Sequence, residues 1–571
     1  MRALRRLAWA PLAVVLVAGC SLPLPQGVEA VGDVPADQRD PVPLAVIPPG
    51  PQPGATPEQT VLGFLGAEAS SVGSHAIARQ FLTGRERTRW HDDTEVQVYA
   101  PDPVQVQQVH ADEAGATVVQ VTTRVVAQIR SDGSYLNRPG VTVTEDYRLT
   151  KTGGQWRLDD VPDGVRLTPA DRLRSYTPRN VYYLATDGDT DTRRLVADRV
   201  FLPVGTDLAR SLVSRLLRSP SQAVAGSATT AVPAGTRLRD VSKGSGGLVT
   251  VDLVGAADRP SGQDAQDLSA QLVWTLRSLG SSFRGLRLRL DGRELKVSGE
   301  GAVQRSGDWD VYDPEGLGPN PPYYYVADRR LRASVNLPSS PATAGLIGDG
   351  RAVPVDAVAV TPDRQRAALL DTSNPRRTVV RVGLLNGRSF PVVAQGRLSS
   401  PTWGSGSQGL WLLRNGADVV QVVGAATRRV TVVGAPSGRL TSLALARDGV
   451  RVALVAGGRL YAGRVQLVSG VPRVVDLTLV LPSLHAVTAV AWSSTTELVV
   501  RGVLTRLAQV VRVAVDGSSV QTVSTAGIAP QALAASPAGV VLVAGGRLYV
   551  SRGGAFQQVD ATAVSAPAFP G

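Results

Sequence analysis

The chain has 571 residues, of which 43% are hydrophobic, and this supplies enough apolar side chains for several buried cores. At the usual size of a domain, this length indicates three or four domains. The formal net charge is +12, but the arginines that carry most of it are scattered rather than clustered with aromatic residues. We therefore expect no nucleic-acid partner. The charge indicates either a solvated arginine-rich surface or an attraction to anionic lipid or wall polymer.

The first residues have the pattern of a bacterial export signal. Arg2, Arg5 and Arg6 form a basic start, and an apolar run from Leu7 to Val17 follows. This run is too short to span a bilayer, and no later stretch reaches about 18 residues without a charge, glycine or proline. Residues 1–19 are therefore predicted to be a signal peptide, and no transmembrane span is expected after them.

A lipobox closes this signal. Val17, Ala18 and Gly19 stand immediately before Cys20, which is the only cysteine of the chain. The pattern predicts cleavage after Gly19, an S-diacylglycerol group on Cys20 and an N-acyl chain on the new amino terminus. Two or more acyl chains anchor a protein stably, so we expect the chain at the outer face of the cell membrane. The alternative is an ordinary secretory signal followed by an accidental cysteine.

Residues 20–55 are predicted to be a lipidated tether and residues 56–168 a small α+β domain. Nine prolines between positions 23 and 53 favour an extended chain in the tether. Thr56 and Pro57 have the pattern of a helix start, and alternating stretches at 116–129, 141–149 and 156–161 indicate strands. Residues 150–154 indicate a hairpin turn. Helices followed by a curved antiparallel sheet resemble the NTF2-like cone.

A second α+β domain is expected at residues 175–300. Strand patterns alternate with two helical patterns, at 207–217 and 268–276. This order resembles the GerMN domain of sporulation and germination proteins, and the resemblance is carried by residues 212–220, 232–236, 249–253, 271–276 and 290–293. It implies a module of envelope assemblies, and it brings no catalytic residues.

Residues 322–562 are predicted to form an all-β propeller of about five to seven blades, after a linker at 301–321 and before a tail at 563–571. The segment Val455–Tyr461 recurs as Val543–Tyr549, 88 residues later, and shorter related segments lie about 44 residues apart. A repeat of this length with several short strands is typical of a propeller blade. Five blades are visible, and Tyr323–Val326 with the C-terminus would supply a closing blade. The alternative is a β-sandwich with chance similarity.

No motif predicts catalysis, a cofactor or a metal site. The acidic run Asp187–Asp191 indicates a hairpin turn, because the sixth position of a calcium loop, which needs glycine, is Thr192. Gly404, Gly406 and Gly409 match a dinucleotide-binding motif in spacing alone, since no helix is expected after them. The densest histidine cluster, at residues 91–93, indicates a solvated loop rather than a zinc site.

Aromatic residues before the propeller are a better lead to a partner. Tyr323, Tyr324 and Tyr325 follow a proline-rich stretch at 316–322. Tyrosine is enriched at protein interfaces, so these three residues are a candidate partner surface. The alternative is that they pack as an outer strand of the propeller.

The order of lipobox, proline-rich tether, NTF2-like domain, GerMN domain and propeller resembles the LpqB lipoprotein family of actinobacteria over nearly the whole chain. The resemblance implies a membrane-anchored extracytoplasmic lipoprotein that is not an enzyme. It also implies contact with the extracellular sensor domain of the MtrB histidine kinase, modulation of the MtrA response regulator, and effects on cell division and wall homeostasis. Cys20 is the family residue that carries over to this sequence.

Two other functions stay open at this point. One is a binder of cell-wall glycan or an envelope-assembly scaffold, which would grip saccharide through exposed aromatic residues. The other is an envelope hydrolase, because 48 acidic residues always permit some catalytic pair of carboxylates. The sequence gives neither the blade number nor the face that meets a partner.

Overall fold

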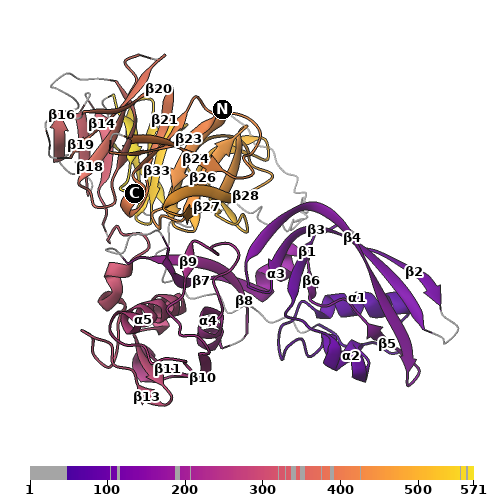
Figure 1. Cartoon of the computed structure of the whole chain (residues 1–571). Helices are drawn as coiled ribbons and strands as arrows, with labels where there is room; N and C mark the ends of the chain where they lie inside the picture. The colour runs from indigo at the N-terminus through magenta and orange to yellow at the C-terminus, as the bar shows by residue number, and fades with distance from the viewer. Residues whose placement is uncertain are drawn as a thin grey trace, which may run out of the picture.

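The computed structural model describes residues 48–571, apart from 103, 112–115, 187–192, 206, 319, 328–329, 336–341, 347–353, 375, 386, 388–390, 425, 553 and 561–562. An N-terminal domain (57–175), a middle domain (176–294) and a propeller (323–568) follow one another. The propeller stands above the middle domain in Figure 1, and the N-terminal domain lies beside both. Among the described residues, no helix is both long and apolar enough to cross a membrane.

The N-terminal domain is a curved sheet closed by short helices, as the NTF2-like resemblance implies. Its elements are α1 (Pro57–Ala67), η1 (Ala78–Phe81), α2 (Gly84–Arg89), β1 (Glu95–Tyr99), β2 (Gln105–Ala111), β3 (Thr117–Arg130), β4 (Tyr135–Thr152), β5 (Gln155–Asp160), β6 (Val165–Leu167) and α3 (Pro169–Ser175). The strand order is β5-β4-β3-β1-β6, and β2 pairs with β3. The Thr56 side chain accepts a hydrogen bond from the backbone N–H of Gln59, which confirms the predicted helix start.

The core of this domain follows from the alternation of β3. Every second residue of that strand from Thr117 to Ile129 is buried, and Val119, Val121 and Ile129 are among them. These side chains pack against Phe64 of α1 and against Trp90, whose rings lie 5.4 Å apart edge to face. The cone is therefore filled by its own apolar side chains at this point.

Glu68 is a buried carboxyl group at the end of α1. It is fully buried, and one of its oxygens accepts the backbone N–H of Arg166 at 2.6 Å. The Arg166 guanidinium pairs with Glu145, also at 2.6 Å. Burial raises the pKa of Glu68 to about 8, and the nearby charge of Arg166 offsets only part of this effect. Glu68 is therefore mainly protonated at neutral pH.

Among its described residues, the middle domain has two α-helices and two small sheets. Its elements are β7 (Tyr176–Ala185), β8 (Leu195–Pro203), α4 (Leu208–Leu216), β9 (Ala228–Thr229), β10 (Arg237–Lys243), η2 (Ser245–Gly247), β11 (Leu248–Val254), α5 (Gly262–Leu276), η3 (Arg277–Ser282), β12 (Gly285–Leu290) and β13 (Arg293–Glu294). Helix α5 connects the parallel pair β11 and β12, and β7, β8 and β9 form the other sheet. Both helices contribute to one apolar core with these sheets. The two helical segments predicted from the sequence are thereby confirmed.

The described strands of the propeller form six blades of four antiparallel strands, and the outermost strands of blades 3 and 4 also pair with each other in parallel. Blades 1 to 3 contain β14 (Tyr323–Ala327), β15 (Arg330–Ser334), β16 (Ala342–Leu346), β17 (Val355–Val360), β18 (Arg366–Asp371), β19 (Thr378–Leu384), β20 (Val392–Gly396), β21 (Leu398–Trp403), η5 (Gly406–Gln408), β22 (Leu410–Arg414), β23 (Asp418–Val423) and β24 (Ala426–Val432). Blades 4 to 6 contain β25 (Leu440–Leu445), β26 (Arg451–Ala456), β27 (Arg459–Val468), β28 (Val471–Leu479), β29 (His485–Ser494), β30 (Glu497–Leu504), β31 (Leu507–Ala514), β32 (Val520–Val523), β33 (Ala532–Ser536), β34 (Gly539–Ala544), β35 (Arg547–Arg552) and β36 (Ala555–Asp560). A linker with η4 (Ser306–Tyr312) precedes them.

The C-terminal strand β37 (Ser565–Ala568) closes the ring as the innermost strand of blade 1. It pairs with β14, where Tyr324 lies opposite Ala568. The innermost strands β17, β21, β25, β29, β33 and β37 each contact the next, and β37 returns to β17. The expected closing blade is thus confirmed. The prediction of a tail at 563–571 outside the propeller was wrong, because blade 1 needs this segment for its innermost strand.

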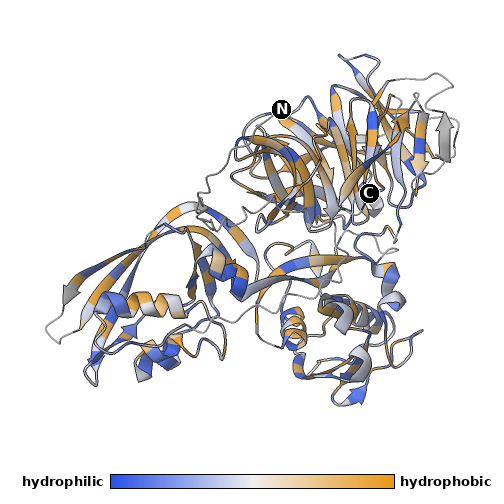
Figure 2. Ribbon diagram, turned by 180° about the vertical axis from the view of Figure 1, so that it is seen from behind, coloured by the Kyte–Doolittle hydropathy of each residue, from blue (hydrophilic) through white to orange (hydrophobic). Residues whose placement is uncertain are grey.

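The sequence repeat arises from equivalent turns in blades 4 and 6. Gly457 and Gly458 join β26 to β27, and Gly545 and Gly546 join β34 to β35. All four have positive φ, between 54° and 72°, which suits a two-residue hairpin and which other residues rarely adopt. The strands before these turns, β26 and β34, are mostly apolar and buried, and Figure 2 shows hydrophobic segments among polar ones across the blades. Packing of each blade against its neighbour buries these strands.

The Glu68→Gln variant is expected to lose a pH dependence of the free energy of unfolding. The pKa of Glu68 rises from an ordinary value of 4.5 to about 8 in the folded chain. The protonated Glu68 side chain therefore contributes its full stabilisation below pH 4.5, and this contribution is lost as the pH rises through 8. The slope is at most about 1.4 kcal/mol per pH unit. Urea unfolding across this range measures it, with Glu58→Gln on the same helix as control. Equal slopes for wild type and Glu68→Gln would contradict the assignment.

Candidate interaction surface

The predicted lipidation site lies outside the described residues. Cys20 and the lipobox residues Val17, Ala18 and Gly19 precede residue 48, where the description of the structure starts. The acidic run Asp187–Asp191 also lies outside it. Lipid attachment at Cys20 therefore stays a prediction from the sequence.

The three tyrosines before the propeller are buried, so they do not form the partner surface that we expected. Tyr323, Tyr324 and Tyr325 are exposed by only 5%, 5% and 4%. Tyr323 and Tyr325 pack towards blade 6, and Tyr324 packs towards blade 2. The alternating side chains of β14 fill the gaps on both sides of blade 1. The covering strand β37 comes from the far end of the chain, which agrees with the closing blade expected from the sequence.

The other motifs occupy turns. Gly406 lies in η5, which joins two strands of blade 3, so no helix follows the glycines as a dinucleotide site would need. His91 is exposed, whereas His75 is buried. Within the described part of the chain, no group of three or more His, Cys, Asp or Glu residues is placed to hold a metal ion.

One end of the propeller docks onto the middle domain through the turn between β25 and β26. Arg447 in this turn is buried, and its guanidinium donates to the carbonyl oxygens of Trp492, Ala535 and Pro570 at 2.8–3.3 Å. These acceptors belong to blades 5, 6 and 1. Arg447 also pairs with Glu315 of the linker, with 3.5 Å between the charged atoms. A single side chain therefore joins four blades to the linker.

Neighbouring residues of the same turn fasten the middle domain directly. The Arg451 side chain pairs with Asp448 and donates to the backbone carbonyl of Ala197 in β8. In the opposite direction, Arg194 of the middle domain donates to the carbonyl of Arg447 at 2.7 Å. We call this end of the propeller the docking face. In each blade, with strands counted from the innermost outwards, it includes the turn between the first and second strands and the turn between the third and fourth strands.

The N-terminal domain joins the same junction through the start of β4. The Asn137 side-chain amide donates to the carbonyl oxygens of Val480 and Asp516 in the propeller, at 2.7 and 3.0 Å. The Asp516 carboxylate in turn accepts from Arg199 of the middle domain at 3.2 Å. The turn around Asp516 therefore touches both other domains, and the three domains form one connected body.

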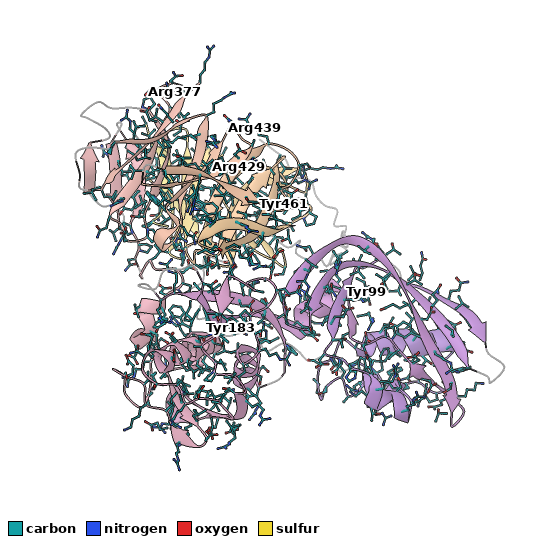
Figure 3. All side chains as sticks on the ribbon, in the orientation of Figure 1. Tyr99, Tyr183, Arg377, Arg429, Arg439 and Tyr461 are labelled. Carbon is teal, nitrogen blue, oxygen red and sulfur yellow. The ribbon has the colours of Figure 1, made fainter. Side chains whose placement is uncertain are left out.

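The opposite end of the propeller is strongly basic in its described loops. We call it the free face, and it consists of the loops between second and third strands and between successive blades, apart from the loop after β28, whose Val480 binds Asn137 of the N-terminal domain. Its described loops carry arginines and no acidic residue: Arg376, Arg377, Arg397, Arg439 and Arg506. All five are exposed. Figure 3 shows Arg377 and Arg439 at the end of the propeller remote from Tyr183 of the middle domain.

The three domains match known families in the order that the sequence predicted. Residues 50–172 match the family described as Lipoprotein LpqB, N-terminal domain, and residues 338–570 match the Lipoprotein LpqB beta-propeller domain. Residues 180–296 match a family described as Sporulation and spore germination. The first relative, Lipoprotein LpqB of Thermobifida fusca (strain YX), is 31% identical, and the similarity covers 89% of each chain.

The chain belongs to the LpqB lipoprotein family. Lipoprotein LpqB of Streptomyces coelicolor is 30% identical over 88% of this chain and 86% of its own length. The protein of the same name from Rhodococcus opacus (strain B4) is 28% identical over 88% and 86%. This membership agrees with an extracytoplasmic, membrane-associated lipoprotein. The structure shows exposed arginines on the free face of a propeller whose other end contacts the middle domain.

Arg447→Met is expected to destabilise the propeller by about 3–5 kcal/mol, because it leaves Glu315 as a buried charge without its partner. Three backbone carbonyls lose their donor at the same time. Urea unfolding measures the effect. Arg377→Met, at an exposed position, is the matched control and should change stability by about 0.5 kcal/mol or less.

Adding Glu315→Gln to Arg447→Met should restore part of the loss, since it removes the buried charge. An unfolding midpoint for Arg447→Met equal to that of Arg377→Met would contradict the role assigned to this turn.

Proposed function

We propose that this chain is an accessory lipoprotein of an MtrB-like sensor kinase, which it contacts through protein–protein interactions at the outer face of the cell membrane. In this proposal Cys20 anchors the chain, and the free face of the propeller meets an acidic surface of the kinase's extracellular sensor domain. The contact modulates the response regulator and so affects wall homeostasis and division. The chain has no enzymatic role in it.

The observation that carries the proposal is the charge of the free face. Five exposed arginines stand in its described loops without an acidic residue among them, while the docking face is occupied by the other two domains. A surface of one charge sign attracts a partner of the other sign and raises the rate of encounter. The middle domain contacts the opposite end of the propeller and leaves these five arginines exposed.

Anchoring supports the same proposal. A lipid anchor confines the chain to the membrane surface where a sensor kinase also lies, and this raises the effective concentration of each for the other. Weak contacts between charged surfaces then suffice for occupancy. The family's name as a lipoprotein agrees with this arrangement.

Cys20→Ala is expected to release the chain from the membrane, because acyl chains can no longer be attached. Fractionation of host cells measures this: the wild type should sediment with membranes and the variant should appear in the soluble exported fraction. Ser21→Ala, which leaves the lipobox intact, is the control and should stay with membranes. Membrane retention of Cys20→Ala after a salt wash would contradict lipid anchoring at this residue.

The triple variant Arg377→Glu, Arg439→Glu and Arg506→Glu is expected to weaken binding to the purified sensor domain by at least about tenfold, which is about 1.4 kcal/mol. Biolayer interferometry with the detergent-solubilised lipoprotein measures the affinity. Binding by the wild type should also fall as salt is raised, because exposed charges are screened.

The matched control carries the same change of charge on the other domains, with Arg85→Glu, Arg289→Glu and Arg293→Glu at exposed positions. It should bind like the wild type. Equal losses in both triple variants would indicate net charge alone and contradict the free face as the contact surface. Absence of kinase binding, with capture of wall glycan instead, would replace the proposal by the glycan-binding or scaffold function.

A further inference from the structure

A small cleft of about 310 Å³ lies between the N-terminal domain and helix α4 of the middle domain. Asp92, Asp93 and Glu95 contribute to it from the segment that leads into β1. Arg130, at the end of β3, and Arg218, just after α4, contribute positive charge. This volume is at the lower end of the range that small-molecule sites occupy. The cleft thus brings together acidic and basic groups from separate segments.

The guanidinium groups of these two arginines make few contacts with protein acceptors in the described structure. Arg130 donates one long hydrogen bond, of 3.5 Å, to the Ser134 hydroxyl, and Arg218 donates one of the same length to the carbonyl oxygen of Ser131. Among the described residues, no acidic side chain forms an ion pair with either of them. Arg215 also lines the cleft, but its guanidinium is occupied by protein acceptors. An anionic ligand group would therefore be bound by Arg130 and Arg218.

His75 is the second feature that points to a ligand. It lines the cleft and is only 4% exposed, its Nδ1 makes no hydrogen bond of ordinary geometry, and the backbone of Glu68 and Ser70 lies close to the ring. Its Nε2 lies 3.8 Å from the Asp92 carboxylate. Burial lowers the pKa of His75 and so favours the neutral ring, and the nearby Asp92 offsets part of this effect. A buried ring nitrogen without a partner is costly unless a ligand or water satisfies it.

The backbone around His75 is held in an unusual conformation. Gly73, Ser74 and His75 all have left-handed φ values, of 59°, 53° and 58°. Only the glycine adopts this region without cost. The Arg79 side chain donates to the carbonyl of Ser74 at 2.9 Å and stabilises the turn. This turn fixes the imidazole against Trp90, with ring centres 5.9 Å apart.

We propose that this cleft binds a small zwitterion of the size of an amino acid or a dipeptide. The ligand's ammonium group lies against Asp93, since Asp92 already pairs with Arg79 at 2.9 Å, and its carboxylate lies against Arg130 and Arg218. The His75 ring forms a hydrogen bond to the polar backbone of the ligand. Opposite charges from separate segments select a molecule that carries both charges over one that carries a single charge. This binding is independent of the proposed contact with a kinase.

Isothermal titration calorimetry on the full-length, detergent-solubilised lipoprotein tests the proposal. The probes are alanine, lysine and alanyl-alanine in their L and D forms, and N-acetyl-alanyl-alanine amide as the uncharged counterpart. At least one free zwitterion should bind, and the blocked dipeptide should bind at least about tenfold more weakly than alanyl-alanine. No binding by any zwitterion at millimolar concentration would overturn the proposal, and so would equal binding of the free and blocked dipeptides.

Two exposed residues locate the site without risk to the fold. Arg218→Gln and Asp93→Asn should each weaken binding of the zwitterion by about tenfold. Arg85→Gln, on an exposed helix outside the cleft, should leave the affinity unchanged. Unchanged affinity in both Arg218→Gln and Asp93→Asn would place the ligand elsewhere and overturn the assignment to this cleft.

Discussion

The buried Arg447 side chain is the interaction on which the arrangement of this molecule depends. A guanidinium group offers five donors in a fixed plane, and here it serves backbone carbonyls of three blades together with the linker carboxylate of Glu315. Removing such a group from water is costly, and only a nearly complete set of acceptors offsets the cost. The acceptor at Pro570 follows the closing strand, so closure of the ring and burial of Arg447 require each other. The same contact holds the linker and, through it, the middle domain.

The charged turns explain why the two ends of the propeller differ. At the docking face, Asp448 and Asp516 are used inside the protein, each paired with an arginine. At the free face, the described loops keep arginines without such partners. Acidic side chains are therefore paired with arginines where the domains meet, and positive charge without such partners remains on the free face. This asymmetry, rather than the total charge of the chain, gives the propeller one face suited to an acidic partner.

Local signals in the sequence were sufficient for elements whose cause is local. The cap at Thr56, the glycine pairs of blades 4 and 6 and the helical spacing in the middle domain each depend on neighbouring residues, and these predictions are confirmed. The burial of Tyr324 and the role of the C-terminal segment depend on strands that meet only after the ring closes. The cleft at His75 is likewise assembled from distant segments. Its one local sign was the density of charges at residues 91–93, which we had assigned to a solvated loop.

The turn between β3 and β4 links the cleft to the junction of the three domains. Arg130 at its start lines the cleft, while Asp132 accepts the side chain of Arg215 through its carbonyl and the backbone N–H of Gln222 through its carboxylate. A few residues further, Asn137 binds the propeller. A ligand held between Asp93 and Arg218 would contact both the N-terminal and the middle domain. Because such a ligand binds the docked arrangement alone, it would stabilise that arrangement in proportion to its occupancy. The orientation of the free face relative to the N-terminal domain would then respond to a small molecule, through contacts that the chain already makes.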